Sequence, residues 1–194
     1  MLKKTLLTAA VAAAGLFTLG QAQAADYTID TEGQHAFVQF KISHLGYSYI
    51  LGSFEEFSGD FSYDPDDLEA SSVEMKVQID SLNSNHAERD RHILNSDFLD
   101  VDEYPTATFT STGFESTGDN EGVVTGDLTL HGQTQEIEMP VTMMGEGEDP
   151  WGGYRAGFEG STMITLSDFD IDMSDYPEAM HELELYVTFE GIRQ

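Results

Sequence analysis

The chain has 194 residues, with 36 acidic and eight basic side chains, no cysteine and a formal charge of −28. A charge of this sign repels phosphate backbones and argues against nucleic-acid binding. The lack of cysteine excludes disulfide bonds, thiolate nucleophiles and cysteine-ligated zinc, so sheet closure and packing must stabilise the fold.

Residues 1–24 have the features of a signal peptide. Lys3 and Lys4 form a positive start, an apolar stretch follows, and Ala22-Gln23-Ala24 is a small-residue cleavage pattern. The apolar stretch is too short and too rich in alanine to span a membrane well, so we expect no transmembrane anchor. We expect cleavage after Ala24 and export to the periplasm. The mature chain, residues 25–194, would be one domain of 170 residues with six basic side chains and a charge of −30.

Beyond residue 35, most of the chain alternates between apolar and polar side chains. Because successive side chains of a strand point to opposite faces, each alternating run predicts a strand with one apolar and one wet face. Turn-forming residues separate the runs, and the rhythm of a parallel βαβ sheet is missing. About eight such strands are typical of an antiparallel sandwich or barrel. The runs cover residues 36–42, 57–63, 73–79, 107–109, 124–130, 137–143, 154–166 and 183–189.

The segment 82–104 interrupts the strands with a short helical pattern that stops at Tyr104-Pro105. Asn83 or Asn85 is placed to cap the helix, and Ser96 is placed to cap a second short turn. Two further segments, 144–153 and 167–182, also look irregular, and long loops of this kind often carry function. The apolar residues of the helical segment would either plug one end of the β-structure or gate its interior; they are Ile93, Leu94, Phe98 and Leu99.

Positive charge gathers in the same segment. Arg89 and Arg91, two of the six basic residues beyond residue 24, lie beside His86, Asp90 and His92. An arginine fork can hold a carboxylate and still offer donors to a polar group of a ligand. Arg89 and Asp90 therefore predict either an ion pair that ties the helix down or a polar mouth over an apolar interior.

Several short motifs follow one another in a specific order and spacing. They are His35 to His44 followed by Leu45-Gly46, Gly52-Ser53-Phe54 with Phe57-Ser58-Gly59, Arg89-Asp90-Arg91-His92-Ile93-Leu94, Ser96-Asp97-Phe98-Leu99-Asp100 with Tyr104-Pro105, and Val124 to Gly132. Together they resemble the YceI-like family, bacterial periplasmic proteins whose lipocalin-like barrel binds polyisoprenoids or related lipids. The chain departs from the family pattern at Ala36, where many relatives have serine, and at residues 166–170, which replace Arg-x-x-Phe-Gly.

The resemblance implies an all-β fold: an eight-stranded antiparallel lipocalin-like barrel with a short helical segment across one end. Such a barrel is either filled by side chains or holds one slim ligand. The resemblance favours a lumen that binds a long-chain isoprenoid or other amphiphilic lipid. Gly59, Gly126 and Gly160 are expected to leave room on its wall.

On this interpretation as a lipid-binding barrel, we assign residues to two parts of the binding site. The head group of the lipid would meet the mouth residues Arg89, Asp90, His92, Leu94 and Phe98. Its apolar chain would lie against lumen residues Phe40, Ile42, Phe61, Val77, Ile79, Phe109, Leu128, Ile137, Met139, Phe158, Ile164, Leu185 and Val187.

Sequence motifs of catalysis are missing. The chain has no Gly-x-Ser-x-Gly elbow, no His-Glu-x-x-His pair and no phosphate-binding glycine loop. Residues 168–174 begin like a calcium loop, but Met173 replaces the turn glycine and Ala179 the bidentate glutamate. We interpret His35, His44, His92 and His131 as strand-end or turn residues. We therefore expect no enzyme activity, catalytic residue, metal or cofactor.

The sequence as a whole predicts periplasmic binding or carriage of an isoprenoid lipid or quinone-like amphiphile in the barrel lumen. Two alternatives remain: a cargo-free structural or stress protein with a packed barrel, and a hydrolase that acts on lipid-like esters. A homodimer is left open.

Overall fold

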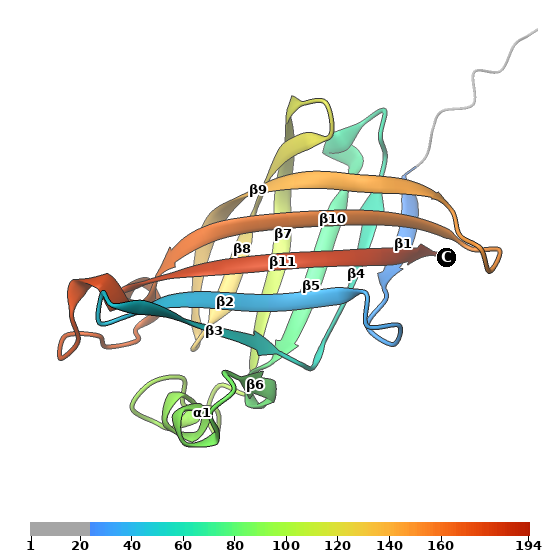
Figure 1. The fold of residues 1–194 in the computed structure, drawn as a ribbon. Coiled ribbons are helices and arrows are strands. Elements are labelled where there is room, and N and C mark those ends of the chain that lie inside the picture. The colour runs from blue at the N-terminus through green and yellow to red at the C-terminus, as the bar shows by residue number, and fades with distance from the viewer. Residues whose placement is uncertain (1–23) are drawn as a thin grey trace, which may run out of the picture.

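The computed structural model describes residues 24–194, and the predicted signal segment lies outside this range except for Ala24. Figure 1 shows these residues as a β-barrel with the helix α1 (Ala87–Leu94) below one end. Short 3₁₀ turns are η1 (Leu68–Ala70), η2 (Ile79–Ser81), η3 (Leu166–Phe169) and η4 (Glu178–Met180). The strands are β1 (Ala25–Ile29), β2 (Ala36–His44), β3 (Ser48–Phe54), β4 (Phe57–Tyr63), β5 (Ser72–Gln78), β6 (Leu82–Asn83), β7 (Thr106–Gly118), β8 (Glu121–Leu130), β9 (Gln133–Glu148), β10 (Tyr154–Thr165) and β11 (Glu182–Arg193).

Eight strands close into a ring in the order β1-β4-β5-β7-β8-β9-β10-β11, and β1 returns to pair with β11. Every neighbouring pair in this ring is antiparallel. At the closing seam, Tyr27 of β1 lies opposite Arg193 of β11. Closure leaves these eight strands without the free edges that an open sheet would expose. The prediction of an eight-stranded antiparallel barrel is confirmed.

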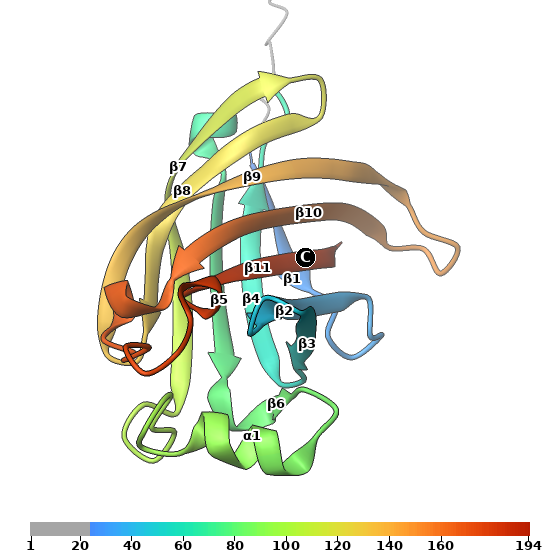
Figure 2. The same ribbon diagram turned by 60° about the vertical axis from the view of Figure 1, so that its left-hand side comes forward.

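β2 and β3 form a hairpin that extends the sheet beyond the ring. β2 pairs with Leu183–Phe189 of β11, whereas β1 pairs with the last residues of that strand. β3 pairs with β2 and, through Ser53 and Phe54 only, with β6. In Figures 1 and 2, β9, β10, β11, β2 and β3 form one curved layer that crosses the layer of β1, β4, β5, β7 and β8. The helix α1 lies across one end of the barrel, as predicted, and β3 and β6 are its neighbours there.

The packed core divides into two clusters. One contains Tyr27, Ile29, Ala36, Phe61 and Ala156, and the ring of Tyr27 stacks on that of Phe61 with centroids 4.7 Å apart. The other includes side chains from the segment after β10 that fold back onto the barrel. Its buried residues are Leu128, Ile164, Leu166, Phe169, Ile171 and Met173. The irregular segment 167–182 is therefore partly core.

The structure corrects several boundaries that the sequence suggested. β1, β3 and β6 were not predicted, and β9 continues to Glu148, which shortens the loop expected at 144–153. His86, not an asparagine, caps α1: its Nδ1 accepts from the amide of Arg89 at 3.2 Å. The next turn begins at Asn95, not Ser96, because Asn95 Oδ1 accepts from the amide of Asp97 at 2.8 Å. In residues 24–194, no helix is long and apolar enough to cross a membrane.

Candidate ligand-binding lumen

A large apolar cavity occupies the interior of the barrel. Its volume is about 840 Å³, within the range of about 300–1,000 Å³ that is typical of small-molecule sites. Arg89 and Ile93 line it at the α1 end, and Glu115 and Val123 line it at the β7–β8 hairpin. Figure 1 shows these two elements at opposite ends of the barrel. The cavity therefore runs along the barrel from one end to the other.

The wall of the cavity is built mainly from inward-facing side chains of the strands. All thirteen residues predicted to line the lumen lie on this wall. Seven of them, including Val77, Phe109 and Leu185, are only half-buried although they point inward. In a barrel filled by side chains they would be fully buried, because protein interiors pack as densely as organic crystals. The barrel is therefore hollow, and the part these residues take in ligand binding stays a prediction.

The strand glycines do not widen the cavity, so that prediction was wrong. A Cβ atom at Gly126 would lie 2.4 Å from Cζ of Phe109. One at Gly160 would lie 2.9 Å from the backbone oxygen of Pro140, and one at Gly59 2.6 Å from a backbone oxygen of β5. Neighbouring groups already occupy these positions, so glycine permits close packing against the backbone and adds no free volume.

One buried serine fastens α1 to the barrel. Ser84, which is 2% exposed, lies just after β6. Arg89 donates from Nε to Ser84 Oγ at 2.7 Å and from Nη2 to the Ser84 backbone oxygen. Asp90 Oδ1 accepts from the Ser84 amide at 2.9 Å and from the Ser84 hydroxyl. The two charged residues do tie the helix down, but each does so through Ser84 and not as an ion pair with the other.

Three of the five predicted mouth residues line the cavity: Arg89, His92 and Phe98. The ring of His92 meets that of Phe98 edge-on, with centroids 4.9 Å apart. Asp90 and Leu94 are not on the wall. The reason is helical spacing: residues 89, 92 and 93 share one face of α1, whereas residues 90 and 94, four apart, lie on the neighbouring face.

Sequence reasoning missed part of the wall near α1. His44 and Ile50 of the β2–β3 hairpin line the cavity, and so do Tyr176 and Met180 from the segment after β10. The ring of Tyr176 packs against that of Phe98, with centroids 5.6 Å apart. The sequence did offer a signal, because Tyr176 and Met180 are large apolar side chains in a segment rich in acidic residues.

The two ends of the cavity differ in charge. Arg89 is the only lysine or arginine on the described wall, and it lies at the α1 end together with His44 and His92. Acidic wall residues gather instead around the β7–β8 hairpin and the adjoining parts of β9 and β10. They are Glu115, Asp119, Glu121, Glu146 and Glu159. A ligand with a negative head group is therefore favoured at the α1 end and disfavoured at the β7–β8 end.

Little reactive chemistry lines the cavity. Burial, with the nearby Glu146 carboxylate, raises the pKa of Tyr63, whose hydroxyl donates to Sδ of Met143 at 3.3 Å. Among residues 24–194 there is no group of three or more histidine and acidic side chains placed to hold a metal ion. His35 and His131 contact Asp30 and the backbone of Phe169, respectively, outside the cavity wall.

Fold and cavity define the class: a closed antiparallel barrel around one apolar lumen with polar groups at its ends. The YceI-like domain matches residues 27–190. A UPF0312 protein of Azotobacter vinelandii is 54% identical over 194 residues, which is the full length of both chains. The chain belongs to the YceI-like family.

Two solved structures share the fold. BcnA of Burkholderia cenocepacia superposes with a TM-score of 0.74 at 23% identity, covering 84% of this chain and 98% of BcnA. A polyisoprenoid binding domain from Saccharophagus degradans superposes with a TM-score of 0.66 at 13% identity, covering 87% of this chain and 98% of that domain. At these identities the likeness establishes the architecture.

Proposed function

We propose that this protein binds an isoprenoid lipid or quinone-like amphiphile in its lumen and carries it through the periplasm. The observation that carries the proposal is the apolar cavity of about 840 Å³ with half-buried side chains on its wall. Each CH₂ group taken out of water contributes about 0.8 kcal/mol, so a twenty-carbon chain gives roughly 16 kcal/mol before the costs of immobilisation. A shared fold with a polyisoprenoid binding domain and membership of the YceI-like family support this ligand class.

The charge of the two ends supports one orientation of the ligand. Arg89 donates hydrogen bonds to Ser84 from two of its nitrogens, Nε and Nη2. Its third nitrogen, Nη1, has no hydrogen-bond partner among the described residues. That nitrogen is available to a phosphate, carbonyl or hydroxyl of a head group. The acidic side chains at the opposite end would repel a phosphate. The head group therefore lies at α1 and the apolar chain extends toward the β7–β8 hairpin.

The two alternative functions have less support. A packed, cargo-free barrel would leave no large cavity, whereas this barrel is hollow. A hydrolase of lipid-like esters needs a hydroxyl nucleophile activated by a base. Among residues 24–194, no serine or threonine hydroxyl is hydrogen-bonded to a histidine, and the cavity histidines His44 and His92 have no carboxylate partner to orient them. We therefore favour lipid binding without catalysis over both alternative functions.

A pair of matched variants tests the lumen as the binding site. Val77→Trp adds an indole ring to the half-buried inner face of β5, and Lys76→Trp adds the same ring to the exposed outer face one residue away. We expect Val77→Trp to displace N-phenyl-1-naphthylamine, a fluorescent apolar probe, and Lys76→Trp to bind it as the parent does. Equal probe binding in both variants, with both folded, would contradict a ligand site in the lumen.

The periplasmic part of the proposal depends on the leader segment. Cleavage after Ala24 would give a product that starts at Ala25. N-terminal sequencing of the protein from a periplasmic extract tests this. A periplasmic product that still carries Lys3 and Lys4 would remove the basis for a cleaved leader and leave the lumen proposal intact.

A further inference from the structure

The β2–β3 hairpin exposes large apolar side chains. Tyr47 is 88% exposed, Tyr49 64%, Leu51 63% and Leu45 43%. We call these four residues the tyrosine lip. Surface leucines and tyrosines are common singly, but four within seven residues form a contiguous apolar feature, and such features mark interaction sites.

Local geometry explains why these side chains face solvent. Leu45 and Gly46 have positive φ angles, 56° and 78°, and form a tight turn in which the Tyr47 amide donates to the His44 backbone oxygen at 3.0 Å. Along β3 the side chains then alternate: Ile50 points into the cavity, so its neighbours Tyr49 and Leu51 point outward. The exposure of the lip follows from the register that places Ile50 on the lumen wall.

The lip borders the mouth of the lumen. Ile42, His44 and Ile50 of the same hairpin line the cavity, opposite Arg89 and Ile93 of α1. Figures 1 and 2 show β3 and α1 at the same end of the barrel. A surface that rests on the tyrosine lip is therefore next to the end where the proposed head-group site lies.

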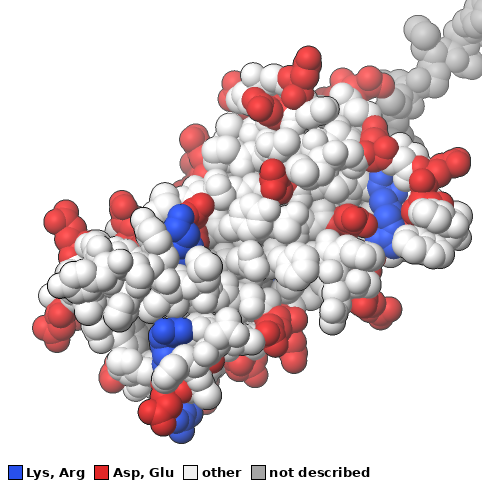
Figure 3. Space-filling view, in the orientation of Figure 1, with Lys and Arg blue, Asp and Glu red and all other residues white. Residues whose placement is uncertain are grey.

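The hairpin differs from the rest of the chain in charge. Residues 33–54 form a run of 22 residues without aspartate or glutamate. The next longest acid-free run after residue 26, residues 104–114, has only 11 residues. The one lysine in residues 33–54, Lys41, lies 2.7 Å from Glu184 and 4.7 Å from the centre of the Tyr49 ring. Figure 3, drawn from this side, shows a broad uncharged area across the face and acidic side chains mostly around its border. The hairpin is thus apolar and nearly neutral.

We propose that the tyrosine lip docks on an uncharged lipid bilayer surface, so that lipid passes between bilayer and lumen without crossing open water. The idea rests on the proposed lipid-binding function. Tyrosine favours the membrane interface, where its ring is buried among apolar groups and its hydroxyl stays hydrated. The acid-free hairpin lets this part of a highly acidic chain approach a bilayer. The acidic border, which includes Glu178 of η4 beside β2, selects zwitterionic over anionic lipid.

A second copy of the chain is the competing occupant. Apart from Ser53 and Phe54, β3 pairs only with β2, which leaves an edge that another strand could extend. Charge disfavours this arrangement, because each mature chain carries −30 and a dimer would bring two such fields together. The bilayer, which adds no net charge when it is zwitterionic, is the better match.

Vesicle flotation tests the inference. Parent protein is mixed with vesicles of phosphatidylethanolamine and phosphatidylcholine, and with vesicles that also contain phosphatidylglycerol. We expect flotation with the first set and less with the second. The triple variant Tyr47→Ser, Tyr49→Ser, Leu51→Ser should reduce flotation about tenfold, because interfacial binding scales with buried apolar area. The control Met144→Ser removes a side chain that is 64% exposed on β9 and should leave flotation unchanged.

Probe binding separates this inference from the function on which it rests. The triple variant should bind N-phenyl-1-naphthylamine as the parent does, because none of its three positions lines the cavity. A parent that binds the probe but does not float with zwitterionic vesicles would overturn docking and leave the lumen proposal standing. A triple variant that floats like the parent would also overturn it. So would a parent dimer, seen by sedimentation, that the triple variant abolishes. Failure of the parent to bind any apolar ligand would instead remove the proposed function.

Discussion

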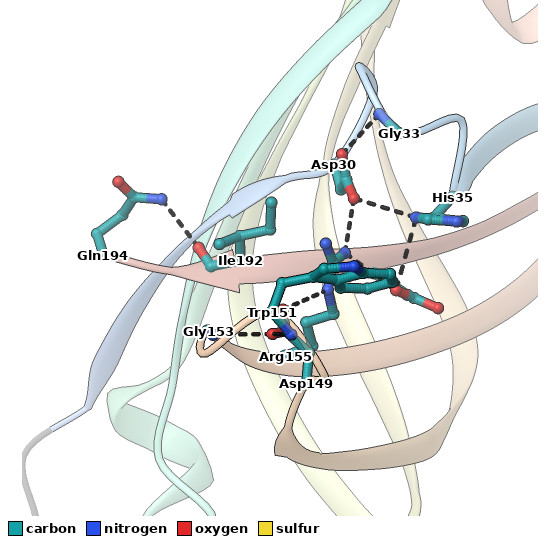
Figure 4. A network of polar contacts seen from close by, with 10 residues as sticks. Asp30, Gly33, His35, Asp149, Trp151, Gly153, Arg155, Ile192 and Gln194 are labelled. Carbon is teal, nitrogen blue, oxygen red and sulfur yellow. Dashed lines mark hydrogen bonds and ion pairs between the residues drawn. The ribbon is translucent and has the colours of Figure 1, made fainter.

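Arg155 of β10 donates from Nη1 to Oδ2 of Asp30 at 2.6 Å, although 125 residues separate them in the sequence (Figure 4). The Asp30 side chain is 6% exposed and that of Arg155 is 18% exposed. Arg155 also donates from Nε to Asp149 at 3.0 Å and from Nη1 to Glu190 at 3.1 Å. One guanidinium thus joins the corner after β1, the β9–β10 loop and β11, at the seam where the barrel closes.

Loss of this guanidinium should destabilise the barrel. Arg155→Gln would leave Asp30 buried without its charged partner, and we expect the free energy of unfolding to fall by about 2–3 kcal/mol. Urea unfolding measures the change. Lys41→Gln is the matched control, because Lys41 also bonds a carboxylate, Glu184 at 2.7 Å, but these two side chains are only half-buried, 41% and 34% exposed. Its effect should be much smaller. Equal losses in the two variants would mean that the Arg155 network does not hold the seam.

The Arg155–Asp30 pair also makes the free energy of unfolding depend on pH. The hydrogen bond from Arg155 lowers the pKa of Asp30 from 3.8 to about 2. Between those values the unfolded chain binds a proton at Asp30 that the folded chain does not. The contribution of Asp30 is therefore complete above about pH 4 and is lost as the pH falls toward the folded-state value. The difference in unfolding free energy between the parent and Arg155→Gln should shrink over this interval, in urea titrations at successive pH values. A difference that stays constant would contradict the assignment.

Arg89 should set the preference for head groups. Arg89→Gln removes the only lysine or arginine from the described wall, and we expect affinity for farnesyl phosphate to fall about tenfold while affinity for farnesol changes little. Fluorescence displacement measures both. Arg91→Gln is the control, because Arg91 is an exposed cation of the same helix that bonds Glu88 and does not line the cavity.

A second variant separates charge from the anchoring of α1. Ser84→Ala removes the hydroxyl that accepts the hydrogen bond from Nε of Arg89, but it keeps the guanidinium group of Arg89. If Arg89 acts on the head group, Ser84→Ala should retain the preference for phosphate over alcohol. Loss of affinity for both ligands in both variants would show instead that Arg89 only positions the helix.

The inward glycines should tolerate no side chain. Gly126→Ala would place a Cβ 2.4 Å from Cζ of Phe109, and overpacking of this kind costs about 1–3 kcal/mol of unfolding free energy. Gly113→Ala, on the neighbouring strand β7, is the control because nothing lies within 4 Å of its Cβ position. Thermal unfolding compares the two. A melting temperature for Gly126→Ala that matches that of Gly113→Ala would mean that the Phe109 ring moves aside freely.

The period-2 pattern predicted the main barrel strands because a closed barrel has one apolar and one wet face along every strand. It failed at β3, where Tyr49 and Leu51 place apolar side chains on the outer face and blur the alternation. β1 was missed because five residues with two buried side chains, Tyr27 and Ile29, give too short a pattern. The exposed lip is thus both the place where the pattern failed and the basis of the docking inference.

The sequence predicted which residues line the cavity, but it did not predict the hydrogen bonds and ion pairs that hold the charged residues in place. Lumen residues follow from side-chain direction, which alternation encodes. Whether the lumen is hollow depends on how far the strands stand apart, and no local pattern encodes that distance. The partners of Arg89 and Arg155 depend on tertiary contacts: Ser84 is an unremarkable serine in the sequence, and Asp30 is one of 36 acidic residues. The helix face of α1, which separates Arg89 from Asp90, required the observed start of the helix at Ala87.

The central claim is that the lumen holds a lipid, and native mass spectrometry of protein isolated from its native host tests it most directly. The account predicts one apolar molecule of isoprenoid or quinone type per chain, released by organic solvent and identified by fragmentation, in the parent and in Lys76→Trp but not in Val77→Trp. Parent protein that is folded and yet carries no lipid, together with a solvent extract that contains no isoprenoid or quinone, would contradict the claim.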